Sequence, residues 1–433
     1  MKQSILIRGV RAVDGTQDAV CDILIQDGRI AKIAAQISAD ADLLLDGSGL
    51  AAMPGLFDMH VHFRDPGQTH KEDLQTGCAA ALAGGVTGVL CMPNTTPPMD
   101  APAQLREFLE RAAQTGVSVY QAGCLTKGLQ GKELADYAAL KAAGAAALSD
   151  DGRPVPTEEL MEEALRRADA EDLLVVSHCE DLGIINGGII NLGRISEQLG
   201  VRGMDRRSED SITERDLALA AKTDTRVHIC HVSTRGSVDA VRQAKARGAK
   251  VSCETAPHYF MLTEEKLLAR DADYRMNPPL RTEDDRKAII EGILDGTIDC
   301  IITDHAPHTA AEKADFETAP NGVVGLETSL SATLTAFYHT GLLELRDIVR
   351  LMSDAPRRLL GLPQCTISEG AAAELILVNP ALEWTVDPEL LHSKSKNTVW
   401  KGMTLKGKPV ITITDGVIRY ADPSVEIKGG ISE

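Results

Sequence analysis

The sequence predicts an α/β fold in which a (β/α)8 TIM-type barrel carries a small discontinuous β-sandwich domain built from both chain ends. Three observations favour this fold. The 433-residue chain is long enough for one large barrel with an appendage. Short apolar runs alternate with amphipathic stretches through its middle, and both ends are rich in strand-forming residues separated by Gly and Pro. We therefore assign residues 1–53 and 366–433 to the β domain and residues 54–365 to the barrel.

The two chain ends share a β-rich texture. Residues 4–50 divide into short strands, and Asp27-Gly28 predicts a hairpin turn between two of them. From residue 366 onward, segments such as GAAAELILVNP and KPVITITDGVIRYA follow the same pattern. Because the ends flank one long middle, we expect them to meet in a single domain. Two independent β extensions are the alternative.

The middle of the chain contains eight strand candidates separated by helix-like segments. The candidates are LFDMHVHF, VTGVLCMPN, VSVYQAGC, AAALSDD, LLVVSHC, RVHICHV, KVSCETAPH and DCIITDHAPH. Amphipathic stretches such as PAQLREFLERAAQTG and SVDAVRQAKARG lie between them. This alternation over the assigned range is typical of a (β/α)8 barrel. A doubly wound open sheet is the alternative, but no GxGxxG follows the first strand, so a dinucleotide site is a weak hypothesis.

The composition narrows the classes of partner. The chain has 45 Lys and Arg against 63 Asp and Glu, a net charge of −18, and such a surface repels phosphate backbones and anionic lipid. Aromatic residues make up only 3%, which argues against stacking platforms for single-stranded nucleic acid. We expect neither nucleic acid nor a membrane as partner. A small anionic substrate would need a local cation, either Arg or a bound metal ion.

Cysteine usage and the apolar segments predict a cytoplasmic protein. The nine Cys include no CxxC pair, which favours reduced thiols over a disulfide framework. The first apolar run is interrupted at Arg8, so we expect no signal peptide. The longest uncharged stretch, from Leu74 to Met99, is broken by Thr, Gly and Pro. We interpret it as a buried helix, a strand and a loop rather than a membrane span.

His60 and His62 in GLFDMHVHFRDPG are the sharpest candidate for metal binding. Strand side chains alternate, so the two imidazoles project from one face and can bind one ion. Asp58 shares that face by the same alternation. An HxH pair alone is a weak signal for a metal site. Potential ligands at the ends of the other strands would strengthen it.

Four further strand ends carry potential ligands: Asp150-Asp151, His178, His231 and Asp304. Barrel active sites form where the strands end, so one shared site is the simpler hypothesis. The predicted ligands are His60, His62, Asp151, His178, His231 and Asp304. Because one catalytic zinc uses three protein ligands, this set favours two metal ions. Imidazole with carboxylate suits Zn²⁺ best, with Mn²⁺ or Co²⁺ as substitutes.

Taken together, the motifs resemble those of the amidohydrolase superfamily and, more narrowly, the long bacterial type of dihydroorotase. The HxH pair and TDHAPH are typical of the superfamily, while HFRDPG, CMPNT and MNPPLR indicate dihydroorotase. The resemblance covers essentially the whole chain. It implies that His60, His62 and Asp304 bind one zinc ion and that His178 and His231 bind the second.

The bridge between the two ions departs from that of many relatives. They use a carboxylated Lys on the fourth strand, but AAALSDDGRP contains no Lys. The long bacterial type bridges with the second Asp of SDDG, here Asp151, which makes Asp150 the weaker candidate. The missing Lys also argues against a hydantoinase.

The resemblance implies reversible cyclisation of N-carbamoyl-L-aspartate to L-dihydroorotate in de novo pyrimidine biosynthesis. A metal-bridging hydroxide would attack the ring amide, with Asp304 as general base and then general acid. Near the substrate, Arg64 shares a strand face with His62 and can bind a carboxylate bidentately. The substrate-binding residues that we predict are His62, Arg64, Asn94, Asn277, His308, Asn321 and Gly322.

Around the site, residues 308–327 predict a lid, or else an ordinary exposed loop. Similar enzymes have Pro-Phe-Gly where this chain has Pro320-Asn321-Gly322, so a polar side chain replaces an aromatic ring. His258 and His305 would orient ligands or substrate, or else be core residues bonded to the backbone.

Two other functions compete with this hypothesis. The same chemistry could act on hydantoin or allantoin, or the chain could be an inactive scaffold for a partner such as aspartate transcarbamoylase. An inactive copy is expected to lose metal ligands, and all of those predicted are present. A homodimer and an association with the transcarbamoylase are expectations from the resemblance.

Overall fold

A barrel of eight parallel strands forms the centre of the computed structural model, which describes residues 3–429. The strands lie in the order β15-β14-β13-β10-β9-β8-β7-β6. Their bounds are β6 Leu56–Val61, β7 Val86–Cys91, β8 Ser118–Cys124, β9 Ala145–Ser149, β10 Leu174–Ser177, β13 Val227–Ile229, β14 Val251–Thr255 and β15 Cys300–Ile301. The predicted (β/α)8 fold is confirmed, since each strand candidate of the sequence contains one of these strands.

The seam between β15 and β6 closes the barrel through only a few contacts. Val61 and His305 form an isolated parallel bridge, and the His62 N–H donates to the His305 carbonyl at 2.8 Å. Deeper in the seam, the Thr303 N–H donates to Asp58 Oδ2 at 3.1 Å. Asp58 is therefore used in closing the barrel. The alternative prediction of an open doubly wound sheet is therefore wrong.

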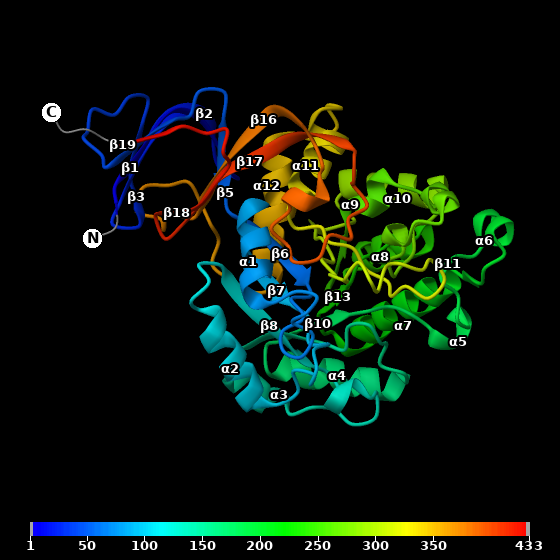
Figure 1. The fold of residues 1–433 in the computed structure, drawn as a ribbon. Helices are drawn as coiled ribbons and strands as arrows, with labels where there is room; N and C mark the ends of the chain where they lie inside the picture. Colours follow the sequence, from blue (N-terminus) through cyan, green and yellow to red (C-terminus); the bar gives the residue numbers. More distant parts are fainter. Residues whose placement is uncertain (1–2, 430–433) are drawn as a thin grey trace.

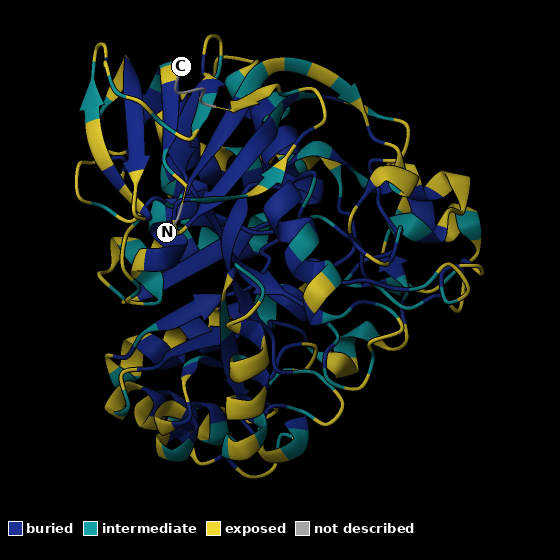
Figure 2. Cartoon of the chain, turned by 60° about the vertical axis from the view of Figure 1, so that its left-hand side comes forward, coloured by how far each residue is buried: buried dark blue, intermediate teal, exposed yellow. Residues whose placement is uncertain are grey.

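Helices surround the barrel and turn their exposed faces to solvent (Figure 2). In α2, Pro102–Ala112, the buried residues Leu105, Phe108 and Ala112 recur at helical spacing, which explains why this amphipathic stretch packs on the sheet. The other long helices are α1 Leu74–Ala83, α4 Glu158–Ala170, α7 Arg207–Thr223, α8 Arg235–Ala246 and α10 Glu283–Leu294. Shorter helices are α3 Tyr137–Ala142, α5 Leu182–Ile185, α6 Arg194–Leu199, α9 Pro257–Met261, α11 Ser329–Thr333, α12 Leu345–Val349 and α13 Ala355–Leu359.

Both chain ends join in one β domain beside the barrel (Figure 1). Its nine strands are β1 Ile5–Val13, β2 Asp18–Gln26, β3 Arg29–Ala34, β4 Leu43–Asp46, β5 Ala51–Pro54, β16 Leu375–Thr385, β17 Thr404–Thr414, β18 Val417–Ala421 and β19 Ile427–Gly429. They pair as a single branched mixed sheet, because β1 contacts β2 on one side and both β4 and β5 on the other. β16 joins the two ends by pairing with β5 and β17. The alternative of two independent extensions is wrong.

The predicted hairpin turn lies between β2 and β3. Asp27 and Gly28 both have positive φ, at 50° and 82°, as the two-residue hairpin turn requires. The predicted domain boundary after residue 53 falls inside β5, one residue before its end, and the one after residue 365 falls between α13 and β16. These boundaries stay predictions. The outermost positions of the β-domain ranges, 1–2 and 430–433, lie outside the described residues.

The β domain also packs against the barrel helices. The Thr412 hydroxyl on β17 donates to the Leu82 carbonyl of α1 at 2.7 Å. The long uncharged stretch that contains α1 is a helix, a strand and a loop, as predicted. Within residues 3–429, none of the helices has the length and hydropathy needed to span a membrane.

Between β10 and β13 the chain makes an insertion that the sequence did not predict. It carries α5, α6 and a two-stranded parallel sheet of β11, Ile190–Asn191, and β12, Gly203–Met204. The insertion follows His178 directly, so it lies beside the mouth of the barrel.

Candidate metal centre

The carboxyl ends of the barrel strands bring the six predicted metal ligands together. Each residue is at or just beyond the end of its strand, and each is buried. Parallel strands place these ends at one mouth, so ligands distant in sequence become neighbours in space. The six are His60, which is the penultimate residue of β6, and His62, Asp151, His178, His231 and Asp304.

Asp151 lies at the centre of this group. Its Oδ1 is 3.3 Å from His60 Nε2, 3.5 Å from His178 Nδ1 and 3.9 Å from His231 Nε2. Its Oδ2 is 3.5 Å from His62 Nε2. Two ligand triads therefore share Asp151: one with His60 and His62, the other with His178 and His231, and in each triad the ligand atoms lie within 4.8 Å of one another.

Asp304 lies beside the two histidines of the first triad, His60 and His62. Its Oδ1 is 3.1 Å from His62 Nε2 and 3.7 Å from His60 Nε2. Burial opposes ionisation, but hydrogen bonding to His62 and the charges of the nearby imidazoles lower the pKa of Asp304 to about 2. The carboxylate is therefore ionised at neutral pH.

Asp150 faces away from the centre. Its Oδ1 accepts the Thr126 N–H at 2.9 Å, and its Oδ2 accepts the Thr126 hydroxyl. Burial raises the pKa of Asp150 to about 6 despite these hydrogen bonds. Of the two aspartates in SDDG, only Asp151 is directed at the histidines.

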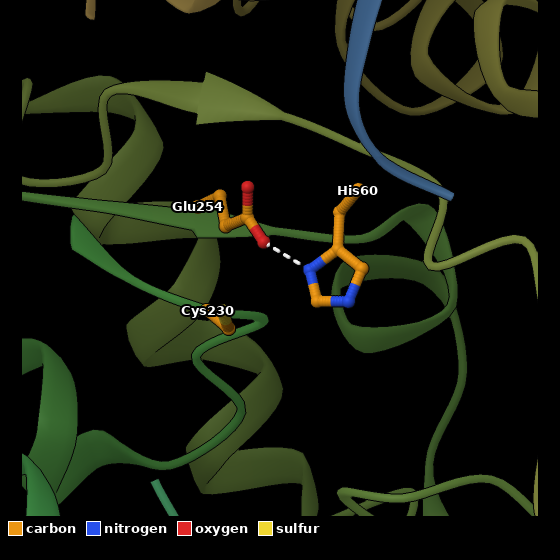
Figure 3. Close-up of side chains that lie close together, drawn as sticks. All are labelled: His60, Cys230 and Glu254. Carbon is orange, nitrogen blue, oxygen red and sulfur yellow. Dashed lines mark hydrogen bonds and ion pairs between the residues drawn. The ribbon is translucent and has the colours of Figure 1, made fainter. Parts of the chain in front are cut away.

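Glu254 on β14 orients His60 from behind (Figure 3). The His60 Nδ1–H donates to Glu254 Oε1 at 2.6 Å, which leaves Nε2 facing Asp151. The second oxygen, Oε2, accepts from His228 Nε2 at 3.1 Å. Burial opposes ionisation of Glu254, but the two histidines lower its pKa to about 2. A carboxylate on the outer nitrogen fixes the ring and tautomer of a metal-binding histidine.

Cys230 lies beside this pair, with its sulfur, a His60 nitrogen and a Glu254 oxygen within 4.8 Å of one another (Figure 3). Burial raises the pKa of the Cys230 thiol, so it is neutral. Glu254 was not predicted as a site residue, although a carboxylate inside the apolar strand VSCET was a usable signal.

Asn94 orients the other histidine of the pair. Its Oδ1 accepts from His62 Nδ1 at 2.9 Å, and its Nδ2 donates to Asp151 Oδ2 at 3.1 Å. The structure therefore places this amide on two of the ligands. Its predicted contact with substrate stays a prediction.

Arg64 and His308 form a second cluster beside the metal ligands. Arg64 Nη2 is 3.3 Å from His308 Nε2, and Arg64 Nε donates to the Pro307 carbonyl at 3.3 Å. His308 Nε2 in turn donates to the Asn321 carbonyl at 2.9 Å. Burial and the neighbouring cations lower the pKa of His308 to about 3, so its ring is neutral. Gly322 follows, with φ of 143° and no room for a Cβ against the Ala306 carbonyl.

Asn277 approaches the site through Glu180. Its Nδ2 donates to Glu180 Oε1 at 2.7 Å, and Glu180 Oε2 is 3.4 Å from His178 Nε2. Glu180 therefore links a predicted substrate residue to a metal ligand. Glu180 was not predicted as a site residue, although it stands two residues after His178 in VSHCED.

The two remaining candidate histidines differ in their contacts. His305 Nδ1 accepts the Gly325 N–H at 3.1 Å, so its Nε2–H faces Glu72 Oε2 at 3.4 Å. This pairing fixes the backbone that holds His62 across the seam. His258 is buried and its Nε2 has no hydrogen-bond partner within residues 3–429. Burial lowers the pKa of His258 to about 4.

Three site residues have strained backbone. Arg64, His231 and Asp304 adopt positive φ values of 58°, 31° and 49°, which non-glycine residues rarely do. Such strain persists only where the surroundings hold it, and it clusters at functional sites. Here it bends the chain at three strand ends and directs the side chains into the mouth.

The ligand set suits divalent cations. His60 Nε2 and Asp151 Oδ1 are buried without a hydrogen-bond partner, although they point at each other. Within the described part of the chain, the ion-pair partners of Asp151 and Asp304 are imidazoles only. Metal ions would satisfy these orphaned atoms and offset the burial of the two carboxylates.

Removing metal from the purified protein is expected to lower its melting temperature by several degrees. Ions that bind only the folded state stabilise it, by about 4 kcal/mol when the free ion concentration is a thousand times Kd. The measurement is thermal unfolding of the protein as purified, after chelation and dialysis, and after re-addition of Zn²⁺. An unchanged melting temperature in a protein shown to have lost its metal would contradict this assignment.

Sequence comparisons with known proteins agree on one family. A family profile described as dihydro-orotase-like matches residues 49–237. The chain is 46% identical to the dihydroorotase of Syntrophotalea carbinolica, over 96% of this chain and 99% of that protein. It is 45% identical to the dihydroorotase of Citrifermentans bemidjiense over the same shares.

Among solved structures, the chain is similar to the L-hydantoinase (dihydropyrimidinase) from Arthrobacter aurescens. The TM-score is 0.87 at 26% identity, covering 99% of this chain and 98% of that one. The dihydropyrimidinase from Brevibacillus agri gives a TM-score of 0.86 at 22% identity, covering 99% and 97%. The second likeness shows the fold alone.

Proposed function

The chain belongs to the dihydroorotase family, and we propose that its barrel mouth holds two zinc ions for the reversible cyclisation of N-carbamoyl-L-aspartate to L-dihydroorotate in pyrimidine biosynthesis. The enzyme is an amidohydrolase. The observation that carries the proposal is the sharing of Asp151 by two ligand triads, with Asp304 beside one of them.

In this proposal each ligand group holds one ion. His60, His62 and Asp304 would hold the first and His178 and His231 the second, with Asp151 available to both groups. Imidazole with carboxylate favours Zn²⁺, with Mn²⁺ or Co²⁺ as substitutes. When bound, such a pair of ions lowers the pKa of a water molecule and stabilises developing negative charge on the amide oxygen.

Asp304 is the group that moves the proton. Its low pKa leaves the carboxylate free to accept a proton from the attacking water, general-base catalysis. The same oxygen then donates this proton to the ring nitrogen as the amide bond breaks. In the biosynthetic direction the order reverses: Asp304 takes the proton from the ureido nitrogen as the ring closes.

Arg64 is the local cation for the substrate carboxylate. Its guanidinium is held by the Pro307 carbonyl and lies beside a neutral His308, so the charge has no carboxylate partner within ion-pair distance in the described chain. An Arg fork can bind a carboxylate with two parallel hydrogen bonds. Asn94, Asn277 and the backbone near Asn321 are placed around the same mouth. In this proposal, Arg64 and these polar groups explain how a protein of net charge −18 binds an anionic substrate.

Metal-loaded protein is expected to hydrolyse dihydroorotate with loss of its ultraviolet absorbance, and Arg64→Met should raise KM at least about tenfold. A hydrogen bond to a charged group contributes about 1.5–3 kcal/mol, and this variant removes two. The measurement is steady-state kinetics with dihydroorotate, hydantoin and allantoin. Faster turnover of hydantoin or allantoin, with little effect of the Arg64 change, would instead favour a cyclic amidase for another ring.

An inactive scaffold is the less favoured alternative. It is expected to lose ligands, whereas all six gather in this structure. Metal analysis of protein purified without chelator separates the two cases, because a scaffold has no reason to retain two ions.

We also propose, from the resemblance, that the protein is cytoplasmic, forms a homodimer and associates with aspartate transcarbamoylase. The nine cysteines are all free, and eight of them are buried, which suits a reducing compartment. Sedimentation of the protein alone and mixed with the transcarbamoylase tests the two assemblies.

A further inference from the structure

We propose that Lys313 is a positioning residue that fixes the backbone of residues 320–322 over the barrel mouth and thereby sets substrate affinity. The inference rests on the proposed function, because it assigns Lys313 to the loop that would face dihydroorotate. Lys313 lies in the segment between His308 and Glu327 that the sequence predicted as a lid.

The Lys313 ammonium group uses its three N–H bonds on three carbonyls. It donates to the Arg275 carbonyl at 3.0 Å, the Pro320 carbonyl at 3.1 Å and the Gly322 carbonyl at 3.0 Å. Arg275 precedes Asn277 by two residues, and it also accepts the Gly322 N–H at 3.0 Å. One side chain therefore ties the 320–322 turn to the loop that carries Asn277.

This turn contacts the predicted carboxylate-binding cluster. The Asn321 carbonyl accepts from His308 Nε2 at 2.9 Å, and His308 lies beside Arg64. The Gly322 carbonyl, held by Lys313, also accepts from Asn397 Nδ2 at 3.0 Å. Asn397 Oδ1 in turn accepts the His308 N–H at 3.1 Å. A shift of the turn would thus move the His308 ring and the polar groups beside it.

The charge of Lys313 is costly at this position, which argues for a specific role. The residue is 8% exposed, and its ammonium group donates to three backbone carbonyls; within residues 3–429 it forms no ion pair with a carboxylate. Burying an ammonium group is unfavourable unless its N–H bonds are satisfied. An apolar side chain could fill the space but would leave the Pro320 carbonyl without its donor. A compact cation with three N–H bonds meets the need of three converging carbonyls.

Lys313 hydrogen-bonds to none of the six metal ligands, and its ammonium group donates only to carbonyls of the 320–322 turn and of the loop that carries Asn277. Its removal should therefore leave the metal centre and the proton transfer by Asp304 in place. Substrate affinity should suffer, because the turn and His308 lose their fixed position. This predicts a change in KM with little change in kcat, the signature of lost binding that is equal in ground and transition states.

The experiment compares the full-length variants Lys313→Met, Lys313→Gln and Lys394→Met with the wild type. Lys394 lines the same cavity of about 560 Å³ as Lys313, but its side chain pairs with Asp73 and the Thr69 carbonyl. It is a control for loss of a cation from that cavity. KM and kcat for dihydroorotate are measured together with metal content and thermal unfolding.

We expect both Lys313 variants to raise KM about tenfold with kcat within about twofold, full metal content, and no KM change in the control. An unchanged KM in a folded Lys313 variant would overturn the inference. So would a parallel loss of kcat and metal, which indicates a structural role only. If the methionine variant does not fold, the glutamine variant decides the outcome. Absence of turnover in the wild type would instead overturn the proposed function.

Discussion

Replacing Asp304 by Asn is expected to lower kcat for dihydroorotate by about 10³-fold, the scale of general acid–base catalysis. The amide keeps the shape of the carboxylate but cannot accept and return a proton at neutral pH. His60, His62 and Asp151 remain to hold the first ion, so most of the metal should be retained. Steady-state kinetics and metal analysis of the same preparation test both statements.

Asp299→Asn is the matched control for this change. Asp299 lies before β15, at the opposite end of the strand from Asp304, and pairs with Lys245 at 2.7 Å. The same chemical change there should leave kcat within about twofold of wild type. A fully metallated Asp304→Asn protein with near-normal kcat would show that another group moves the proton.

The barrel was predictable because its strands are short apolar runs that end in polar, functional residues. The seam shows where this reasoning stops. The last strand candidate, DCIITDHAPH, yields only two residues of strand, because Asp58 and His305 complete the closure. A side chain that replaces a ladder hydrogen bond leaves no periodicity to detect. The alternation of Asp58 with His60 predicted a shared face but gave no sign that the Asp58 carboxylate accepts the Thr303 N–H at the seam.

The ligands were predictable for a related reason. Each lies at or just beyond the end of a parallel strand, and these ends share one mouth whatever their distance in sequence. Glu254 and Glu180 were not placed because their roles depend on long-range partners. Glu254 contacts His60, which is 194 residues away, and Glu180 contacts Asn277, 97 residues away. Lys313 is similar, since its three carbonyl acceptors come from two separate loops and leave no signature in the sequence.

Replacing Asp151 by Asn is expected to reduce the bound metal to one ion or less and to lower kcat by at least about 10³-fold. Asp151 is the one residue common to both triads, and its Oδ1 faces three histidines between 3.3 and 3.9 Å away. Without it, the second ion keeps only His178 and His231 of these ligands. A neutral amide also removes negative charge that offsets two divalent cations. Metal analysis and kinetics on the same sample measure both effects.

Asp150→Asn provides a control one residue away, and the contrast between the two variants tests the assignment within SDDG. Asp150 accepts from the backbone and hydroxyl of Thr126, so its amide variant should lose about 1 kcal/mol of stability while keeping its metal and its kcat. If Asp150→Asn instead loses metal and Asp151→Asn does not, the bridging residue has been misassigned. Equal loss of metal in both variants would mean that the turn after β9 as a whole, rather than one carboxylate, holds the ions. Only loss confined to Asp151→Asn agrees with a carboxylate that is directed at both pairs of histidines.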